Sequence, residues 1–203
     1  MDITELRNSM GKEMDMTRLR DSMKKVLSEK RYIHSLGVEE VCHDLALIYG
    51  ADIEKAEIAG ILHDCAKYLT KEEFLSEAKR YRLPISPYER DNPYMLHAKL
   101  GLIYAREKYG INDEEILNAI LFHTTGRPNM TLLEKIVYVS DYIEPNRKPF
   151  PGLDEAREVA YRNLDEAVII VSKCTLYYLN EKGVNIDPAT KTTYEYYVNQ
   201  ANI

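Results

Sequence analysis

The stretch IAGILHDCA, residues 58–66, is an apolar run in which His63 and Asp64 are the only strongly polar side chains. An ionised carboxylate is almost never fully buried without a partner, because leaving water costs it several kcal/mol. No basic residue lies within this run to act as that partner. The run therefore predicts a buried helix that presents an imidazole and a carboxylate to the protein interior.

Four further apolar segments carry a single histidine or aspartate in the same way. They contribute His123 in AILFHTTG (119–126), Asp141 in IVYVSDYI (136–143), His97 in MLHAKLG (95–101) and His34 in YIHSLGV (32–38). A lone histidine on an apolar face is more often a core residue with satisfied hydrogen bonds than a ligand. Two aspartates buried in separate helices, in contrast, would require two buried ion pairs if no metal were present. We therefore interpret the five segments as helices that converge on a metal site.

A second His-Asp dipeptide, His43-Asp44, provides an internal comparison. The apolar stripe of its segment consists of Val38, Val41, Leu45 and Ile48. His43 and Asp44 fall on the opposite face, beside Glu39 and Glu40, and that face is predicted to be solvated. The dipeptide alone is therefore a weak signal, and its apolar setting at residues 63 and 64 is what indicates a site.

Nearly every segment shows the 3.6-residue apolar period of a helix, and no stretch alternates convincingly with the two-residue period of a strand. Breaks between helices are expected at Gly50, at Pro84 with Pro87, at Gly110, at residues 126–128, over residues 145–152 and at Gly183. Helix N-caps are expected at Asn112, Thr131 and Asp154. The sequence predicts an all-α fold of about eight to ten helices. Residues 1–16 are expected to be a polar N-terminal extension, and residues 17–203 a single domain.

The composition excludes several classes of protein. The 203 residues are 45% hydrophobic and 30% charged, with a net charge of -6, which is typical of a globular domain and gives no general attraction for nucleic acid polymers or anionic membranes. No apolar run approaches the roughly 18 residues of a membrane span. The three cysteines, without CxxC spacing, favour a reducing compartment, and we expect a cytoplasmic protein that could form a homodimer.

The order His…His-Asp…His…His…Asp resembles that of the HD-domain metal-dependent phosphohydrolases. Longer stretches resemble one subgroup, the YqeK-type symmetrical diadenosine tetraphosphate hydrolases. These stretches are RYIHSLGVEEV (31–41), AGILHDCAKYL (59–69), AILFHTTGRPNMTLLEKIVYVSDYIEPNR (119–147) and NIDPATKTTYEYYVN (185–199). HTTGRP and DYIEPNR are specific to the subgroup, whereas the HD dipeptide is not. The resemblance implies a single HD-domain helical bundle, over residues 17–203, with a central metal site.

Carried over residue by residue, the resemblance implies four metal ligands: His34, His63, Asp64 and Asp141. His97 and His123 match positions that face the phosphates or help to hold a second metal. A set of imidazoles and carboxylates suits Fe, Mn, Co, Ni or Zn better than Mg or Ca. The resemblance favours iron, as one or two ions.

The resemblance also implies a nucleotide-binding surface around the metal. Lys67, one helical turn after Asp64, is similar to a phosphate contact, and Arg147 matches a contact to a nucleotide phosphate. The ligands His34, Asp64 and Asp141 and the histidines His97 and His123 are also expected to face the substrate. A loop is expected to close over the nucleotide, and it consists of Ile186, Asp187, Pro188, Ala189, Thr190 and Lys191. Asp64, Lys67, His97 and His123 are the expected catalytic residues.

The expected reaction is symmetrical hydrolysis of diadenosine tetraphosphate to two ADP. A bound transition metal lowers the pKa of its water to near neutrality, and phosphoanhydride cleavage then depends on positioning and charge neutralisation. The same metal-binding residues would also suit another nucleotide phosphohydrolase, such as a nucleotidase or a phosphodiesterase. A metal- or nucleotide-sensing HD module without turnover is an alternative of a different class.

Overall fold

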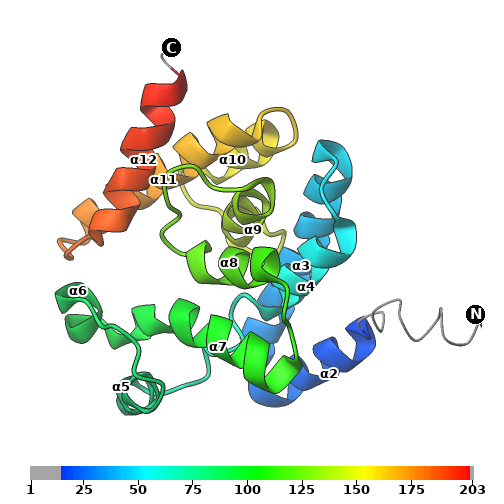
Figure 1. Ribbon diagram of the computed structural model, residues 1–203. Coiled ribbons are helices and arrows are strands. Elements are labelled where there is room, and N and C mark those ends of the chain that lie inside the picture. Colours follow the sequence, from blue (N-terminus) through cyan, green and yellow to red (C-terminus); the bar gives the residue numbers. More distant parts are fainter. Residues whose placement is uncertain (1–14, 202–203) are drawn as a thin grey trace, which may run out of the picture.

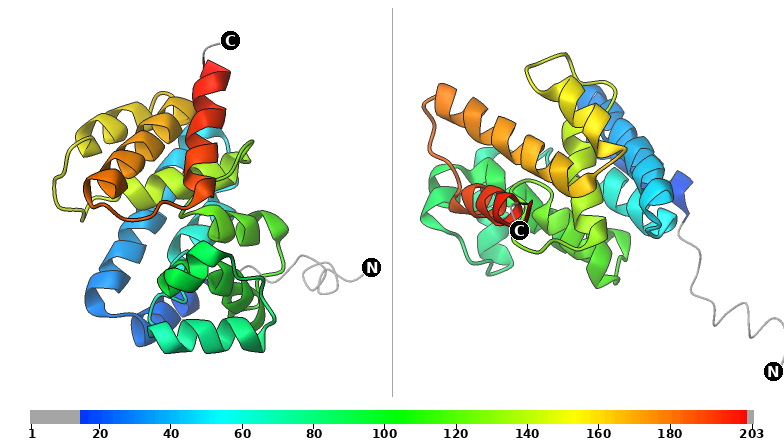
Figure 2. Two further views of the ribbon diagram at one scale, coloured as in Figure 1. Left: turned by 90° about the vertical axis from the view of Figure 1, so that its left-hand side faces the viewer. Right: turned by 90° about the horizontal axis from the view of Figure 1, so that it is seen from above.

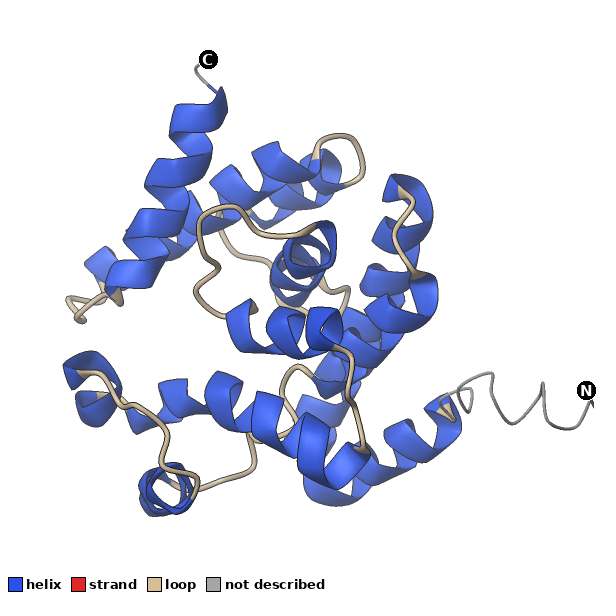
Figure 3. Ribbon diagram, in the orientation of Figure 1, coloured by secondary structure: helices blue, strands red, loops and turns tan. Residues whose placement is uncertain are grey.

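The computed structural model describes residues 15–201, and every regular element within them is a helix (Figures 1 and 3). The elements are α2 (Met16–Val26), α3 (Glu29–Tyr49), α4 (Ile53–Leu62), α5 (Lys71–Arg80), α6 (Pro87–Asp91), the 3-10 helix η1 (Pro93–Leu96), α7 (His97–Tyr109), α8 (Glu114–Phe122), α9 (Leu132–Ile143), α10 (Leu153–Ala160), α11 (Leu164–Glu181) and α12 (Pro188–Ala201). No helix in this part of the chain is long and apolar enough to cross a bilayer. The all-α prediction is confirmed.

The described residues hold eleven α-helices and one 3-10 helix, more than the eight to ten expected. Part of the excess lies where Pro84 and Pro87 indicated a loop. Ser86 caps a short helix there through a capping box with Glu89, and Pro87 occupies its first turn, where its missing N–H costs nothing. The predicted extension, residues 1–16, lies outside the described residues except for its last two. Of these, Asp15 caps α2 and Met16 packs against the core.

Helix α9 is the central element of the fold, and it contacts α3, α4, α8, α10 and α11 (Figures 1 and 2). Its sequence LLEKIVYVSDYI is apolar on nearly all sides, and Ile136, Val137 and Val139 are fully buried. A helix of this kind is stable only when neighbours cover it all round. Asp141, near its C-terminal end, is therefore held in the middle of the bundle.

Helix α9 begins at the predicted cap, Thr131, whose hydroxyl accepts from the Glu134 N–H in a capping box. The other two predicted caps are wrong. Asp113 rather than Asn112 caps α8, and its carboxylate accepts from two backbone N–H groups. Gly152 precedes α10, and Asp154 lies within its first turn.

The predicted faces of α3 are confirmed in part. His43 is half exposed and its Nδ1 lies 2.8 Å from Glu57, away from the central polar cluster, as expected for a solvated pair. Glu39, in contrast, is only 4% exposed, because Arg20 of α2 covers it and forms an ion pair with it. Ile48, assigned to the buried stripe, is 50% exposed in the last turn of the helix. The periodicity of one helix could not reveal which neighbouring helix covers each face.

The close contact between α3 and α4 depends on Gly60. A Cβ at this position would lie 2.9 Å from the Cα of Glu39, and the backbone cannot move aside as a flexible side chain would. We expect Gly60→Ala to lower the free energy of unfolding by about 1–3 kcal/mol, the usual cost of overpacking. Chemical denaturation measures this. Helix propensity alone predicts a stabilisation of about 1 kcal/mol, so a gain in stability would contradict the expectation.

Candidate metal centre

His34 and Asp141 lie within α3 and α9, as predicted, whereas the other four site residues lie at helix ends, which corrects the prediction that they lie inside helices. His63 and Asp64 directly follow α4, His123 directly follows α8, and His97 is the first residue of α7. The last carbonyl groups of an α-helix lack backbone partners. The imidazoles of His63 and His123 donate to two such carbonyls, those of Gly60 and Ile120, at 2.7 Å each. Each helix end thus fixes the ring that follows it.

All four histidines of the site use Nδ1 for a fixed partner. His63, His97 and His123 each place Nδ1 at 2.6–2.7 Å from the backbone carbonyl three residues earlier. His34 places Nδ1 at 3.2 Å from the carboxylate of Glu144. A carbonyl or carboxylate oxygen can only accept, so Nδ1 carries the proton in each neutral ring and the lone pair resides on Nε2.

The Nε2 atoms of His34 and His63 meet the two carboxylates. They lie 3.3 Å apart, and Oδ1 of Asp141 lies 3.1 Å from His34 Nε2 and 3.9 Å from His63 Nε2. Asp64 Oδ2 lies 3.5 Å from His63 Nε2 and 3.9 Å from His34 Nε2. The four residues predicted as metal ligands therefore form one compact group, although their role as ligands stays a prediction.

A second group surrounds the other oxygen of Asp64. Oδ1 lies 3.5 Å from His97 Nε2 and 3.6 Å from His123 Nε2, and these two nitrogens are 3.1 Å apart. Lys67 Nζ approaches His97 Nε2 to 2.9 Å, and Thr124 Oγ1 lies 3.1 Å from both ring nitrogens. Asp64 thus bridges the two groups, with one carboxylate oxygen in each.

The donor set is compatible with a divalent metal ion. Nε2 atoms that carry lone pairs repel each other at 3.1–3.3 Å unless a cation or a proton lies between them. Asp64 Oδ1 is buried and has no hydrogen-bond partner among residues 15–201. Donor atoms of His34, His63 and Asp141, and of His63, Asp64 and His123, lie within 4.8 Å of one another. Imidazole nitrogen mixed with carboxylate oxygen is the chemistry of transition-metal sites.

Electrostatics favour ionised carboxylates and a neutral imidazole here. Burial by itself raises the pKa of Asp64, but Lys67 and the neighbouring imidazoles outweigh it and hold that pKa well below its usual range. Burial is likewise opposed at Asp141, whose pKa is kept low by His34, His63 and Arg147. The pKa of His97 is well below its usual value, chiefly because burial penalises the imidazolium and also because of the Lys67 ammonium. Neutral imidazole and carboxylate are the forms that bind metal.

The two aspartates also have guanidinium partners, which the apolar runs did not reveal. Arg31 Nη1 lies 2.7 Å from Asp64 Oδ2, and Arg147 Nη2 lies 2.8 Å from Asp141 Oδ1. The two ion pairs that a metal-free explanation requires are therefore present. Asp64 is buried as predicted, whereas the Asp141 side chain is 25% exposed. The aspartates alone therefore do not indicate a metal, and the convergence of four Nε2 atoms carries that argument.

Sequence reasoning missed three residues of the site: Arg31, Thr124 and Glu144. Arg31 precedes His34 by one turn of α3, and Glu144 follows Asp141 by three residues at the C-terminal end of α9. Thr124 directly follows His123. The sequence could have indicated these three residues by their position, because each lies one helical turn from a proposed ligand or next to one.

The segment predicted to close over the nucleotide is mostly helical. Only Ile186 and Asp187 belong to the loop, because α12 begins at Pro188 and Asp187 Oδ1 accepts from the Ala189 N–H as in a helix cap. Thr190 is buried, and Lys191 is exposed. The description of residues 186–191 as a loop is therefore wrong, and their contact with a nucleotide stays a prediction.

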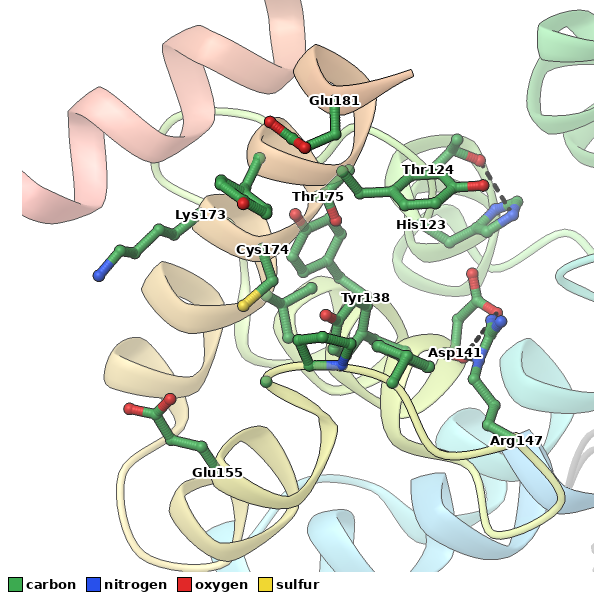
Figure 4. A pocket seen from close by; sticks show the side chains of 17 residues that line it. His123, Thr124, Tyr138, Asp141, Arg147, Glu155, Lys173, Cys174, Thr175 and Glu181 are labelled. Atoms are coloured by element: carbon green, nitrogen blue, oxygen red, sulfur yellow. Dashed lines mark hydrogen bonds and ion pairs between the residues drawn. The ribbon is translucent and has the colours of Figure 1, made fainter.

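The two groups of His and Asp side chains together form a cage of His34, His63, Asp64, His97, His123 and Asp141. A cavity of about 880 Å³ opens beside this cage (Figure 4). His123 and Asp141 line its inner end together with Arg147, and its walls are side chains of α9, α11 and the 145–152 loop. The volume lies within the usual range for small-molecule sites, roughly 300–1,000 Å³. The cage therefore has room for an organic ligand next to it.

Comparison with known proteins gives the family of this arrangement. The family model described as HD domain matches residues 31–146, the part of the chain that contains every histidine and aspartate of the cage. The chain belongs to the HD-domain family. A crystal structure titled as a predicted HD superfamily hydrolase involved in NAD metabolism, from Clostridium acetobutylicum, is 42% identical and superposes with a TM-score of 0.87, covering 92% of this chain and 98% of that one.

HD-domain relatives with curated names are similar over most of their length. The symmetrical bis(5'-nucleosyl)-tetraphosphatase of Bacillus subtilis (strain 168) is 46% identical over 172 residues, which cover 85% of this chain and 91% of the relative. The protein of the same name from Staphylococcus aureus is 40% identical over 175 residues, which cover 84% of this chain and 88% of the relative. The similarity therefore extends beyond the HD domain proper to the C-terminal helices.

Proposed function

We propose that this HD-domain protein is a metal-dependent hydrolase that cleaves diadenosine tetraphosphate symmetrically into two ADP. The cage of four Nε2 atoms and two carboxylates carries the proposal, because that donor set suits a metal that activates water for phosphoanhydride hydrolysis. The names of the relatives support the choice of substrate. We assign this activity to the domain over residues 17–203.

In this proposal His34, His63, Asp64 and Asp141 hold the metal. Iron is the favoured ion, with Mn, Co, Ni and Zn as alternatives, and a second ion would use His97 and His123. When bound, the metal supplies an activated water and neutralises phosphate charge. Asp64 has one carboxylate oxygen in each group and would contribute to either site.

The phosphates would meet the cations at the edge of the cage. Arg31, Lys67 and Arg147 are partly exposed and each contacts one of the two aspartates, so their remaining donors can bind phosphate oxygens. A bidentate guanidinium suits this purpose well. His97 and His123 are the candidates to protonate the leaving phosphate if one metal is present, and His123 is the better one because burial and Lys67 keep His97 neutral.

The adenosine of one half of the substrate is proposed to lie against residues 186–191, and the substrate as a whole is a free nucleotide. Asp187 and Lys191 are the charged members of this segment, and Lys191 is exposed. The protein acts on this nucleotide in the cytoplasm, without a nucleic acid or membrane partner.

The decisive experiment is an anaerobic incubation of iron-loaded protein with diadenosine tetraphosphate, followed by ion-exchange chromatography of the products. We expect ADP as the sole product. ATP plus AMP would keep a phosphohydrolase but contradict symmetrical cleavage. No turnover by protein with confirmed bound metal would contradict the proposed activity and favour a nucleotidase, a phosphodiesterase or a sensor.

A further inference from the structure

The cavity beside the cage has two chemically different ends. Its inner end contains the imidazole of His123, the carboxylate of Asp141 and the guanidinium of Arg147 (Figure 4). Its outer part extends along α11, away from the central polar cluster. This outer part is largely apolar, but its lining also includes Glu155, Lys173 and Glu181. An occupant that fits both ends is therefore anionic where it meets Arg147, and further out an apolar ring with polar edge groups.

Aromatic rings dominate the outer part of the cavity. Tyr142 and Phe150 pack edge to face, with ring centroids 5.2 Å apart. Tyr177 and Tyr178 of α11 also line the cavity and are 65% and 59% exposed. Two adjacent tyrosines left this open, at the edge of a cavity, are surfaces on which a flat ring can stack. The aromatic walls thus match a nucleobase rather than an aliphatic chain.

This cavity is distinct from the segment proposed to bind adenosine. None of residues 186–191 lines it. Residues 188–191 begin α12, which packs on α11 and is anchored near the cage where Thr193 donates to the Thr125 carbonyl. Two regions next to the cage are therefore candidates for binding an organic group. One lies at the start of α12, and the other lies between α9, α11 and the 145–152 loop.

A symmetrical dinucleoside tetraphosphate requires two binding regions of this kind, one for each nucleoside. Cleavage at the centre of the phosphate chain places one nucleoside on each side of the reacting phosphorus. We infer that the cavity between α9, α11 and the 145–152 loop binds the second nucleoside of the substrate, with its phosphates toward Arg147 and its base against Tyr177 and Tyr178. This inference rests on the proposed function and adds a second subsite to it.

The test removes the two exposed rings without touching the cage. We expect the double variant Tyr177→Ala/Tyr178→Ala to raise KM for diadenosine tetraphosphate about tenfold, the loss typical of one base–aromatic stack, with little change in kcat. Tyr161→Ala removes an exposed tyrosine that does not line the cavity, and its KM is expected to equal that of the unaltered protein. An unchanged KM in the double variant overturns the inference.

A second measurement has its deciding outcome in the unaltered protein. Equilibrium dialysis of the unaltered protein with ADP, the expected product, is expected to give two ADP per chain at saturation, and one per chain in the double variant. One ADP per chain in the unaltered protein overturns the second subsite. Failure of the proposed function is distinguishable, because it removes turnover of the unaltered protein, whereas failure of the subsite leaves that turnover intact.

Discussion

Asp64→Asn is expected to abolish both metal retention and hydrolysis of diadenosine tetraphosphate. The substitution keeps the size of the side chain but removes the negative charge that faces both groups of the cage. It also leaves Arg31 and Lys67 without their carboxylate partner, so two cations would then repel the metal. Because the metal contributes several kcal/mol of transition-state stabilisation, we expect kcat/KM to fall at least about a thousandfold.

The measurement is metal content after dialysis, by elemental analysis, together with turnover. Asp64→Ala is expected to give the same two losses. His43→Ala is the matched control, because it alters the other His-Asp dipeptide, at which His43 contacts Glu57 away from the cage. The control should retain metal and activity. Full activity in the Asp64 variants would contradict the metal cage as the catalytic site.

The cage residues could be predicted from the sequence because each interrupts an apolar run. A histidine or aspartate within an apolar run is visible without knowledge of the fold, and the structure brings His34, His63, Asp64 and Asp141 into one group. The all-α fold could be predicted for the same reason, since helical periodicity is written in each segment.

What could not be predicted is which residue meets which across the fold. Arg31 neutralises Asp64 from a segment 33 residues earlier, and Arg20 covers Glu39 from a different helix. Neither ion pair can be recognised from the sequence that surrounds the carboxylate. Periodicity also continues smoothly past Leu62 into His63, so the end of α4 could not be located. Helix ends depend on hydrogen bonds and packing that the pattern does not encode.

Glu144→Gln is expected to weaken metal binding by about 10–100-fold, the usual cost of altering a partner of a ligand. Glu144 is buried, and its Oε1 accepts from Nδ1 of His34, so it fixes the tautomer that turns Nε2 toward the cage. Among the four histidines of the cage, His34 alone has a carboxylate at Nδ1 in the described part of the chain, and His63, His97 and His123 use backbone carbonyls. Glutamine keeps an acceptor in place but removes the charge that makes the imidazole a stronger donor to metal.

The position of Glu144 is determined by several contacts at once. Its Oε2 accepts from the Asn146 N–H at 2.7 Å, and Arg157 donates to the Glu144 backbone carbonyl at 2.8 Å. Gly37, one turn after His34, leaves the space for the carboxylate, since a Cβ there would lie 2.6 Å from Oε2. Glutamine fits the same space but has a single acceptor oxygen, so if this oxygen faces His34 the amide NH2 faces the Asn146 N–H. The variant therefore tests the charge together with the loss of the Asn146 hydrogen bond.

Titration of the metal-free protein with Co²⁺, followed by visible absorption, measures both affinity and ligand geometry. Glu39→Gln is the matched control, because Glu39 is a buried glutamate on the same helix as His34 and pairs with Arg20 instead of the cage. We expect the control to bind Co²⁺ like the unaltered protein and Glu144→Gln to show a weaker, altered spectrum. Equal affinity and identical spectra in both variants would mean that His34 needs only an acceptor at Nδ1. In that case the carboxylate of Glu144 would serve packing alone, and His34 would be equivalent to the three histidines that rely on the backbone.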